Sequence, residues 1–106
     1  MATKQAKLKK DGTRVYNISE SSSRKGDFAE YYAVTWLWDN GYEVFPNAGC
    51  NGPVDIIALK DGEVTLIDVK TNTTRGTRSK EQRELGVMFL SFDPETRKLR
   101  WVEHHK

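Results

Sequence analysis

Residues 52–70 read GPVDIIALKDGEVTLIDVK and form the most regular pattern in the chain. Asp61-Gly62 is a typical two-residue turn of a β-hairpin, because both residues tolerate the positive φ angles that such a turn requires. Apolar residues flank the turn on both sides, as expected for two paired strands. With this turn, the strands are in a register that places Asp55 directly opposite Asp68.

The far end of this predicted hairpin carries an unusual group of charges. Side chains alternate between the two faces of a strand. Asp55, Asp68 and Lys70 therefore share one face with four apolar residues nearer the turn, which are Ile57, Leu59, Val64 and Leu66. Two carboxylates opposite each other repel, and they lose hydration if they are partly buried. Lys70 supplies one compensating charge, and a divalent cation bound by oxygen ligands, Mg²⁺ or Mn²⁺ and not zinc, would supply more.

Two alternatives remain open at this point. Asp68 and Lys70 could form a solvent-exposed ion pair at a strand end, which is common and contributes little. A three-residue loop instead of a two-residue turn would shift the register and place Asp55 and Asp68 on opposite faces.

A helix is predicted from about Arg24 to Asn40, with Gly41 placed to end it in a left-handed cap. Glu30 falls on the same side as an apolar set made of Ala33, Val34 and Leu37. The opposite side carries Phe28, Tyr31, Tyr32 and Thr35. A chain of 106 residues offers little second layer to cover these aromatic rings. We therefore expect this aromatic side to form a homo-oligomer interface.

The remaining elements define the fold class. Further strands are predicted at 42–47, 86–93 and 98–104, with a short helix at 80–85. The pattern indicates a single small α/β (α+β) domain with a mixed sheet behind a long helix. We assign residues 23–106 to this domain and residues 1–22, which are polar and basic, to a flexible arm.

The cysteine content and the lack of long apolar runs indicate in which compartment the protein is expected. The single cysteine cannot form an internal disulfide, which favours a reducing compartment, and we expect a cytoplasmic location. No apolar run is long enough to cross a membrane, and the basic N-terminus lacks the apolar segment of a signal peptide. The small size suits a gene of a phage or mobile element.

The stretches GPVDIIAL and LIDVK resemble the signature of the PD-(D/E)xK nuclease superfamily. In this resemblance Asp55 is the first acid, Asp68 the second and Lys70 the lysine. The preceding GDFAEYYAVTWLWDNGYEVF resembles the first core helix and strand of that superfamily, with Glu30 at the position of its helical glutamate. Gln82 resembles a glutamine of the Holliday junction resolvase and homing endonuclease branches. The motif reads PVD where the family pattern has PD.

The resemblance implies a restriction-endonuclease-like core that hydrolyses phosphodiester bonds with Mg²⁺ or Mn²⁺. Its metal ligands would be Asp55, Asp68, the backbone carbonyl of Val69 and, directly or through water, Glu30. Lys70 would orient or deprotonate the attacking water or contact the phosphate. Gln82 would steady the water or the backbone. These five side chains, Asp55, Asp68, Lys70, Glu30 and Gln82, are the predicted catalytic set.

The segment that follows Lys70, TNTTRGTRSK at 71–80, is rich in hydroxyl and basic side chains. Such side chains are those that most often contact phosphates. We predict DNA contacts from Thr71, Thr73, Thr74, Arg75, Arg78 and Lys80. The alternative is an ordinary mobile polar loop.

The leading hypothesis is a Mg²⁺-dependent DNA endonuclease that works as a homodimer or homotetramer. Within this class, a homing or restriction-like enzyme and a junction-resolving enzyme are both compatible with the sequence. A DNA-binding module or an assembly subunit without catalysis is the alternative. RNA is not excluded as a substrate.

Overall fold

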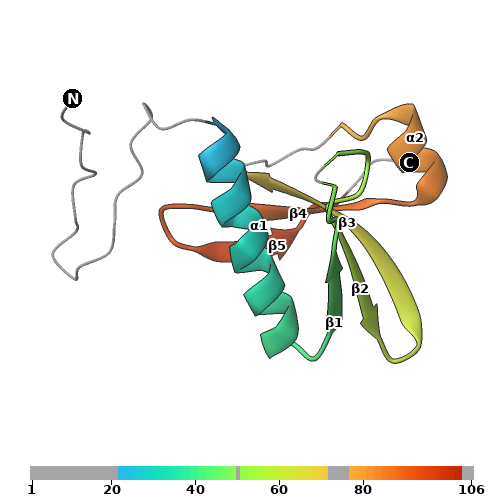
Figure 1. Ribbon diagram of the computed structural model, residues 1–106, viewed down its shortest axis with the longest axis horizontal. Coiled ribbons are helices and arrows are strands. Elements are labelled where there is room, and N and C mark those ends of the chain that lie inside the picture. Colours follow the sequence, from blue (N-terminus) through green and yellow to red (C-terminus); the bar gives the residue numbers. More distant parts are fainter. Residues whose placement is uncertain (1–21, 50, 72–76, 104–106) are drawn as a thin grey trace, which may run out of the picture.

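The sheet of this protein is mixed, with a long helix before it. The computed structural model describes residues 22–49, 51–71 and 77–103. The elements are α1 (Ser22–Asp39), β1 (Glu43–Pro46), β2 (Ile56–Lys60), β3 (Glu63–Thr71), α2 (Lys80–Leu85), β4 (Met88–Asp93) and β5 (Lys98–Trp101). Five strands form one sheet in the order β1-β2-β3-β4-β5, in which β3 and β4 are parallel and the other neighbours antiparallel (Figure 1). The predicted α+β class with a mixed sheet is confirmed.

The β2–β3 hairpin has the register that the Asp61-Gly62 turn predicts. Asp61 and Gly62 have φ angles of 54° and 78°, as a two-residue turn of this type requires. Leu59 pairs with Val64, and Ile57 pairs with Leu66. The alternative of a three-residue loop is therefore wrong, and the two acids are carried toward the same end of the hairpin.

Helix α1 ends as the sequence predicts, at a left-handed glycine. Gly41 has a φ of 88°. Its N–H donates to the carbonyl of Trp38, and the N–H of Tyr42 donates to the carbonyl of Leu37. These two bonds form a Schellman motif, which satisfies the last carbonyls of the helix and turns the chain into β1.

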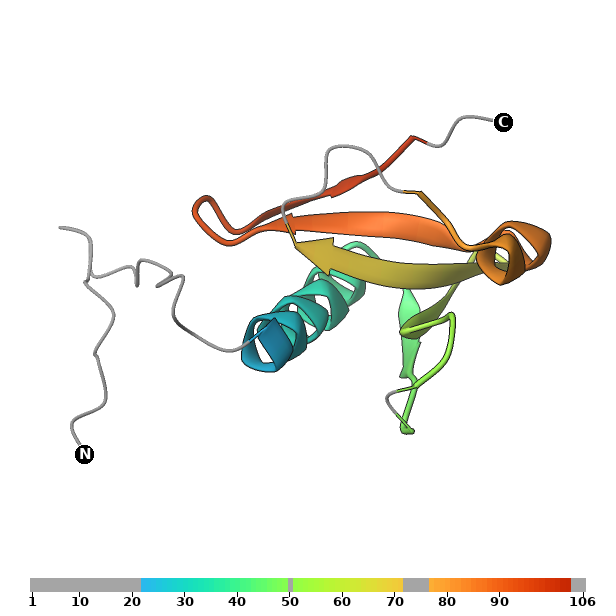
Figure 2. The same cartoon turned by 90° about the horizontal axis from the view of Figure 1, so that it is seen from above.

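The core lies between α1 and one face of the sheet. Seen from above, α1 runs beneath the sheet on one side (Figure 2). The central cluster is fully buried and consists of Ala33, Leu37, Ile56, Ala58, Ile67 and Leu90. Alternate residues of β2 and β3 therefore face the helix, and Ala33 and Leu37 occupy the inward side of α1 as predicted.

The aromatic side of α1 is partly covered by the chain itself. The rings of Phe28 and Tyr32 lie 5.8 Å and 5.1 Å from the ring of Phe92 on β4. The expectation that no second layer would cover these rings is therefore wrong for Phe28 and Tyr32, because the sheet extends beneath them. Tyr31 and Trp38 remain exposed, at 76% and 62%.

Several predictions concern residues outside the described ranges. The basic arm at 1–22 is one of them, apart from Ser22, which begins α1. Thr73, Thr74 and Arg75 are others. Among the described residues, the helices are too short or too polar to pass through a lipid bilayer.

Candidate active site

The two hairpin acids meet where β2 begins. The N–H of Asp55 donates to the carbonyl of Ile67, at 2.8 Å. One residue beyond the regular ladder, the Oδ2 atom of Asp55 accepts a hydrogen bond from the N–H of Val69, also at 2.8 Å. The carboxylate thus satisfies a backbone donor of β3. This bond holds Asp55 within hydrogen-bonding distance of the Asp68 carboxyl.

Asp68 is buried and is contacted from two sides. Its exposed fraction is 8%. Its Oδ2 atom accepts a hydrogen bond of 2.7 Å from Nε2 of Gln82 and lies 3.2 Å from Nζ of Lys70. The Lys70 ammonium also lies 5.3 Å from the ring centroid of Phe89. The ion pair and the ring together hold the ammonium beside the Asp68 carboxylate, while 43% of the lysine side chain stays exposed.

Gln82 joins helix α2 to the hairpin. Its Nε2 donates both to Asp68 and to the carbonyl of Pro53, which lies 3.0 Å away. Its Oε1 accepts from the N–H of Ser79, and the Ser79 hydroxyl accepts from the N–H of Gln82, so the two residues form a capping box. One buried side chain therefore starts α2 and fixes the orientation of Asp68.

The capping box was missed in the sequence, although its signal is present. Ser79 is followed three residues later by Gln82, which is the spacing of this motif. Asn47 was also missed. Its side chain donates to the carbonyls of Asn51 and Val54 and accepts from the N–H of Gly49, so it orders the loop that leads to Asp55. Nothing in the spacing of this loop distinguishes Asn47 from an ordinary turn residue.

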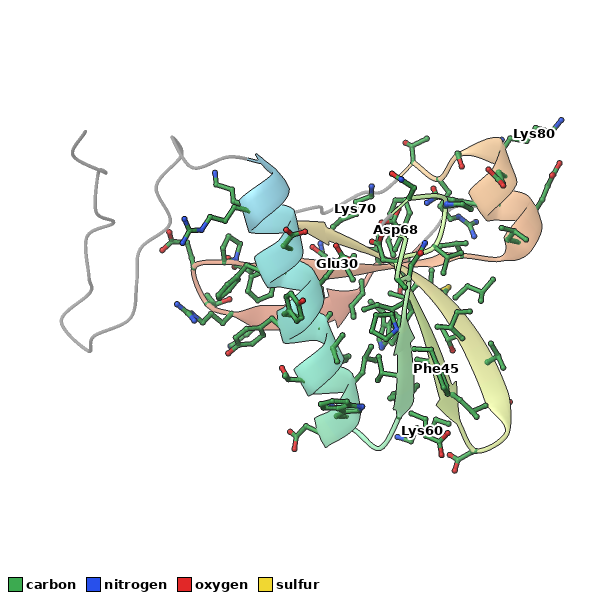
Figure 3. The ribbon with its side chains drawn as sticks, viewed as in Figure 1. Glu30, Phe45, Lys60, Asp68, Lys70 and Lys80 are labelled. Atoms are coloured by element: carbon green, nitrogen blue, oxygen red, sulfur yellow. The ribbon has the colours of Figure 1, made fainter. Side chains whose placement is uncertain are left out.

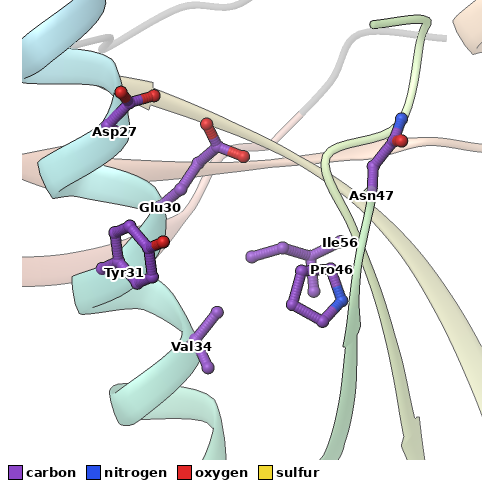
Figure 4. A pocket seen from close by; sticks show the side chains of 7 residues that line it. All are labelled: Asp27, Glu30, Tyr31, Val34, Pro46, Asn47 and Ile56. Carbon is purple, nitrogen blue, oxygen red and sulfur yellow. The ribbon is translucent and has the colours of Figure 1, made fainter. Parts of the chain in front are cut away.

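Glu30 faces the same region from α1. Burial, the charge of Asp27 and the charge of Asp68 raise the pKa of Glu30 above its ordinary value. Glu30 also lines a pocket of about 260 Å³ between α1 and β1. In Figure 4, Glu30 and Asp27 lie at one end of this pocket, Asn47 lies across it, and Val34, Pro46 and Ile56 line its apolar part. Figure 3 shows Glu30, Asp68 and Lys70 in one neighbourhood at the end of the sheet.

The oxygen-rich donor set fits a hard divalent cation. Asp55 and Asp68 come within hydrogen-bonding distance, and their mutual repulsion would be relieved by a cation between them. In the described part of the chain, no three acidic, histidine or cysteine side chains lie at metal-ligand spacing. Glu30 therefore does not join the two aspartates in a three-ligand group in this conformation.

The environment of Asp55 makes its charged form unfavourable. Burial, a hydrogen bond with Asp68 and the negative charges of Asp68 and Glu30 raise the pKa of Asp55 from 3.8 to about 7, although the bond from Val69 opposes this change. Between pH 3.8 and about 7, Asp55 therefore keeps its proton in the folded protein and loses it in the unfolded chain. The stability associated with that proton is complete below pH 3.8 and is lost as the pH rises through about 7.

We therefore expect Asp55→Asn to change the pH dependence of stability. The amide cannot ionise, and its oxygen can still accept from Val69. In the presence of a chelator, the variant should be as stable as the wild type near pH 4 and more stable at pH 8. Urea unfolding at both pH values measures this. An equal difference in unfolding free energy at the two pH values would contradict the assignment of the shift to Asp55.

The predicted DNA-contacting residues are placed differently from one another. Nη1 of Arg78 donates to the carbonyl of Val87, at 3.2 Å, so part of the hydrogen-bonding capacity of this guanidinium is taken up within the protein. Lys80 is 83% exposed at the outer end of α2 (Figure 3). Thr71 is half-buried at the end of β3, directly after Lys70. Of this described group, Lys80 is the most accessible to a ligand.

Comparison with known proteins places this geometry in a family. No curated protein sequence matches the chain significantly. The fold is similar to that in a structure described as a bacterial homing endonuclease, I-Ssp6803I. The TM-score is 0.65 with 16% sequence identity, over 77% of this chain and 68% of the other. At this identity the similarity concerns the fold alone.

Residues 21–92 match the family model described as archaeal Holliday junction resolvase (hjc). Since the match covers more than half of the sequence, the chain belongs to the archaeal Holliday junction resolvase family of PD-(D/E)xK nucleases.

Proposed function

We propose that this protein is a Mg²⁺- or Mn²⁺-dependent DNA endonuclease that cuts four-way junctions. The observation that carries the proposal is the convergence of Asp55, Asp68, Lys70 and Gln82 at one end of the hairpin. A solvated ion pair at a strand end would not require that Asp68 be buried, that Asp55 lie beside it and that the Gln82 amide donate to it. Family membership favours a junction over a duplex site as the substrate.

In this proposal, Asp55 and Asp68 hold the cation, with the carbonyl of Val69 as a further oxygen ligand and Glu30 acting through water. When bound, the cation would polarise the scissile phosphate and lower the pKa of the attacking water. Gln82 fixes Asp68 in the orientation that binding requires. Lys70 places a fixed positive charge where the phosphate gains negative charge in the transition state, and it orients the attacking water.

DNA contact is assigned to the segment after β3 and to the start of α2. Lys80 and Thr71 are the described members of this set with the strongest support, because they flank the segment that leaves the site. Thr73, Thr74, Arg75 and Arg78 complete the proposed set. Each basic residue that neutralises a phosphate should steepen the loss of DNA affinity with salt.

The first test is cleavage of a four-way junction compared with linear duplex of the same sequences. We expect cleavage with Mg²⁺ or Mn²⁺, none in a chelator, and a preference for the junction. Cleavage of a specific duplex site without preference for the junction would favour the homing or restriction-like enzyme. Metal-independent DNA binding without any cleavage would contradict the nuclease proposal and favour a binding module.

A further inference from the structure

The pocket between α1 and β1 has an apolar part and an acidic end. Its volume is about 260 Å³. Val34, Pro46 and Ile56 line the apolar part, and the carboxylates of Asp27 and Glu30 lie at one end (Figure 4). None of the described residues that line this pocket is basic. A ligand that fills it should therefore have apolar faces and hydrogen-bond donors along one edge.

Tyr31 supplies an aromatic surface at the mouth of the pocket. It is among the lining residues, yet its exposed fraction is 76%, so most of its surface remains in water. The rings of Phe28 and Tyr32 on the same helix differ from it, because they pack against Phe92. An aromatic ring that is exposed beside an apolar pocket is suited to stack on a flat ligand.

The wall opposite α1 is fixed by hydrogen bonds and is joined to the candidate active site. The side-chain amide of Asn47 donates to two carbonyls of its own loop. The N–H of Asn47 donates to the carbonyl of Asp55, at 2.8 Å. On the α1 side, Glu30 lies in the neighbourhood of Asp68 (Figure 3). The pocket therefore adjoins the two aspartates that we assign to the metal.

We propose that this pocket binds one nucleobase of the DNA, unstacked from its neighbours, next to the phosphate that is cut. The inference rests on the proposed nuclease function. Enzymes that take a base out of the stack hold it between aromatic or apolar side chains and contact its Watson–Crick edge. Tyr31, Val34 and Pro46 supply such surfaces, and the carboxylates of Asp27 and Glu30 supply acceptors for the edge.

Size and charge make a nucleobase the best occupant. Drug-sized ligands occupy pockets of about 300–1,000 Å³, so this smaller pocket suits a single heterocycle. A phosphate group would be repelled by Asp27 and Glu30. A small inorganic cation would be attracted by them, but the apolar wall offers it no oxygen ligands. A nucleobase is uncharged, and it has apolar faces and donors at its edge, so it matches both parts of the pocket.

The acidic end predicts which bases the pocket prefers. Carboxylates accept hydrogen bonds from exocyclic amino groups, as Glu and Asp do from N4 of cytosine in DNA grooves. Cytosine, adenine and guanine carry such an amino group. Thymine carries none and would direct carbonyl oxygens toward Asp27 and Glu30. We therefore expect thymine to be the poorest occupant among the four bases.

The pocket would also contribute to the preference for a branched substrate. Taking a base out of a duplex costs free energy, and the cost is smallest where pairing and stacking are already interrupted. The nucleotides that adjoin the branch point of a four-way junction lie at such an interruption. Binding one of them in the pocket would favour cleavage of a junction over cleavage of continuous duplex.

The test is a thermodynamic cycle between the base and Tyr31. Four-way junctions carry cytosine, thymine or an abasic nucleotide at each position that adjoins the branch point, in turn. Fluorescence anisotropy measures their affinity for the full chain, with Ca²⁺ in place of Mg²⁺. For the wild type, we expect the abasic nucleotide at one position to weaken binding by about 5- to 100-fold, the usual loss for one stacked base. Thymine there should weaken binding less than the abasic nucleotide.

Three variants define the expected pattern. Tyr31→Ala should bind the cytosine junction as weakly as the wild type binds the abasic one, with little further loss on the abasic junction. Asp27→Asn keeps the shape of the side chain and should reduce the discrimination against thymine while the abasic effect persists. Trp38→Ala is the matched control, because Trp38 is a 62% exposed aromatic residue on α1 that does not line the pocket. It should keep the wild-type dependence on the base.

Several results would overturn the inference. One is a wild type that binds the cytosine and abasic junctions equally at every position. Another is a Tyr31→Ala protein, folded by circular dichroism, that keeps the wild-type dependence on the base. An equal loss of this dependence in Trp38→Ala would assign the effect to α1 as a whole and not to the pocket.

Cleavage assays separate this inference from the proposed function. A wild type that cuts junctions with Mg²⁺ but shows no dependence on the base contradicts the pocket assignment alone. A wild type that binds junctions but cuts no substrate contradicts the nuclease function, and the affinity cycle then still decides whether the pocket takes a base. A protein that binds no junction at all contradicts both.

Discussion

Lys70→Ala is expected to lower the rate of DNA cleavage by roughly 10²- to 10³-fold, the usual loss when one fixed transition-state donor is removed. The lysine side chain is 43% exposed, and its pair with Asp68 spans 3.2 Å. An ion pair of this exposure contributes at most about 1 kcal/mol to stability. The expected loss is therefore chemical, and the variant should unfold close to the wild-type temperature. Single-turnover cleavage of a four-way junction at saturating metal measures the effect.

Two further variants identify what Lys70 supplies. Lys70→Arg keeps the positive charge but changes its geometry, and it should recover only part of the rate. Asp68→Asn is nearly isosteric and can still accept from Gln82, but it removes a charged ligand. It should abolish both cleavage and the binding of Mn²⁺ measured by calorimetry. A Lys70→Ala protein that cuts at the wild-type rate would exclude the proposed role of this residue.

Gln82→Ala should have the largest effect on stability among the site variants. Gln82 is 8% exposed, and its side chain bonds to Asp68, to the carbonyl of Pro53 and to the N–H of Ser79. Leaving one buried polar group without a partner costs about 1–3 kcal/mol. Since water can reach some of these groups after truncation, we expect a total loss of about 2–4 kcal/mol. Urea unfolding in a chelator measures this loss without any contribution from metal.

Two matched variants divide the roles of Gln82. Gln82→Glu keeps the oxygen that accepts from Ser79, but it replaces the donor to Asp68 with a repelling carboxylate. We expect it to retain α2 and to lose cleavage. Ser79→Ala removes one bond of the capping box and should cost about 1 kcal/mol while cleavage persists. Equal losses of stability and activity in the two variants would show that Gln82 acts through α2 and has no separate effect on Asp68.

Local backbone preferences are enough to predict how the hairpin and the end of α1 place the acids of the candidate active site. The Asp61-Gly62 turn has few alternatives because its backbone angles suit few residues, and it fixes the register of every pair in the hairpin. That register carries Asp55 and Asp68 to one end. Gly41 likewise fixes the end of α1. The predictions of the hairpin register and of the end of α1 are confirmed, because each depends on the conformational preferences of one or two residues.

Contacts between elements that are far apart in the sequence cannot be predicted from such local preferences. Gln82 meets Asp68 and Pro53 only because α2 packs beside the start of β2, at separations of 14 and 29 residues along the chain. Arg78 donates to the carbonyl of Val87, and Phe92 of β4 packs against the rings of Phe28 and Tyr32; no local pattern predicts these contacts. Local sequence patterns predict which side chains share a face of a helix or strand. Which face is then covered depends on the packing of distant elements, and this is a property of the whole fold.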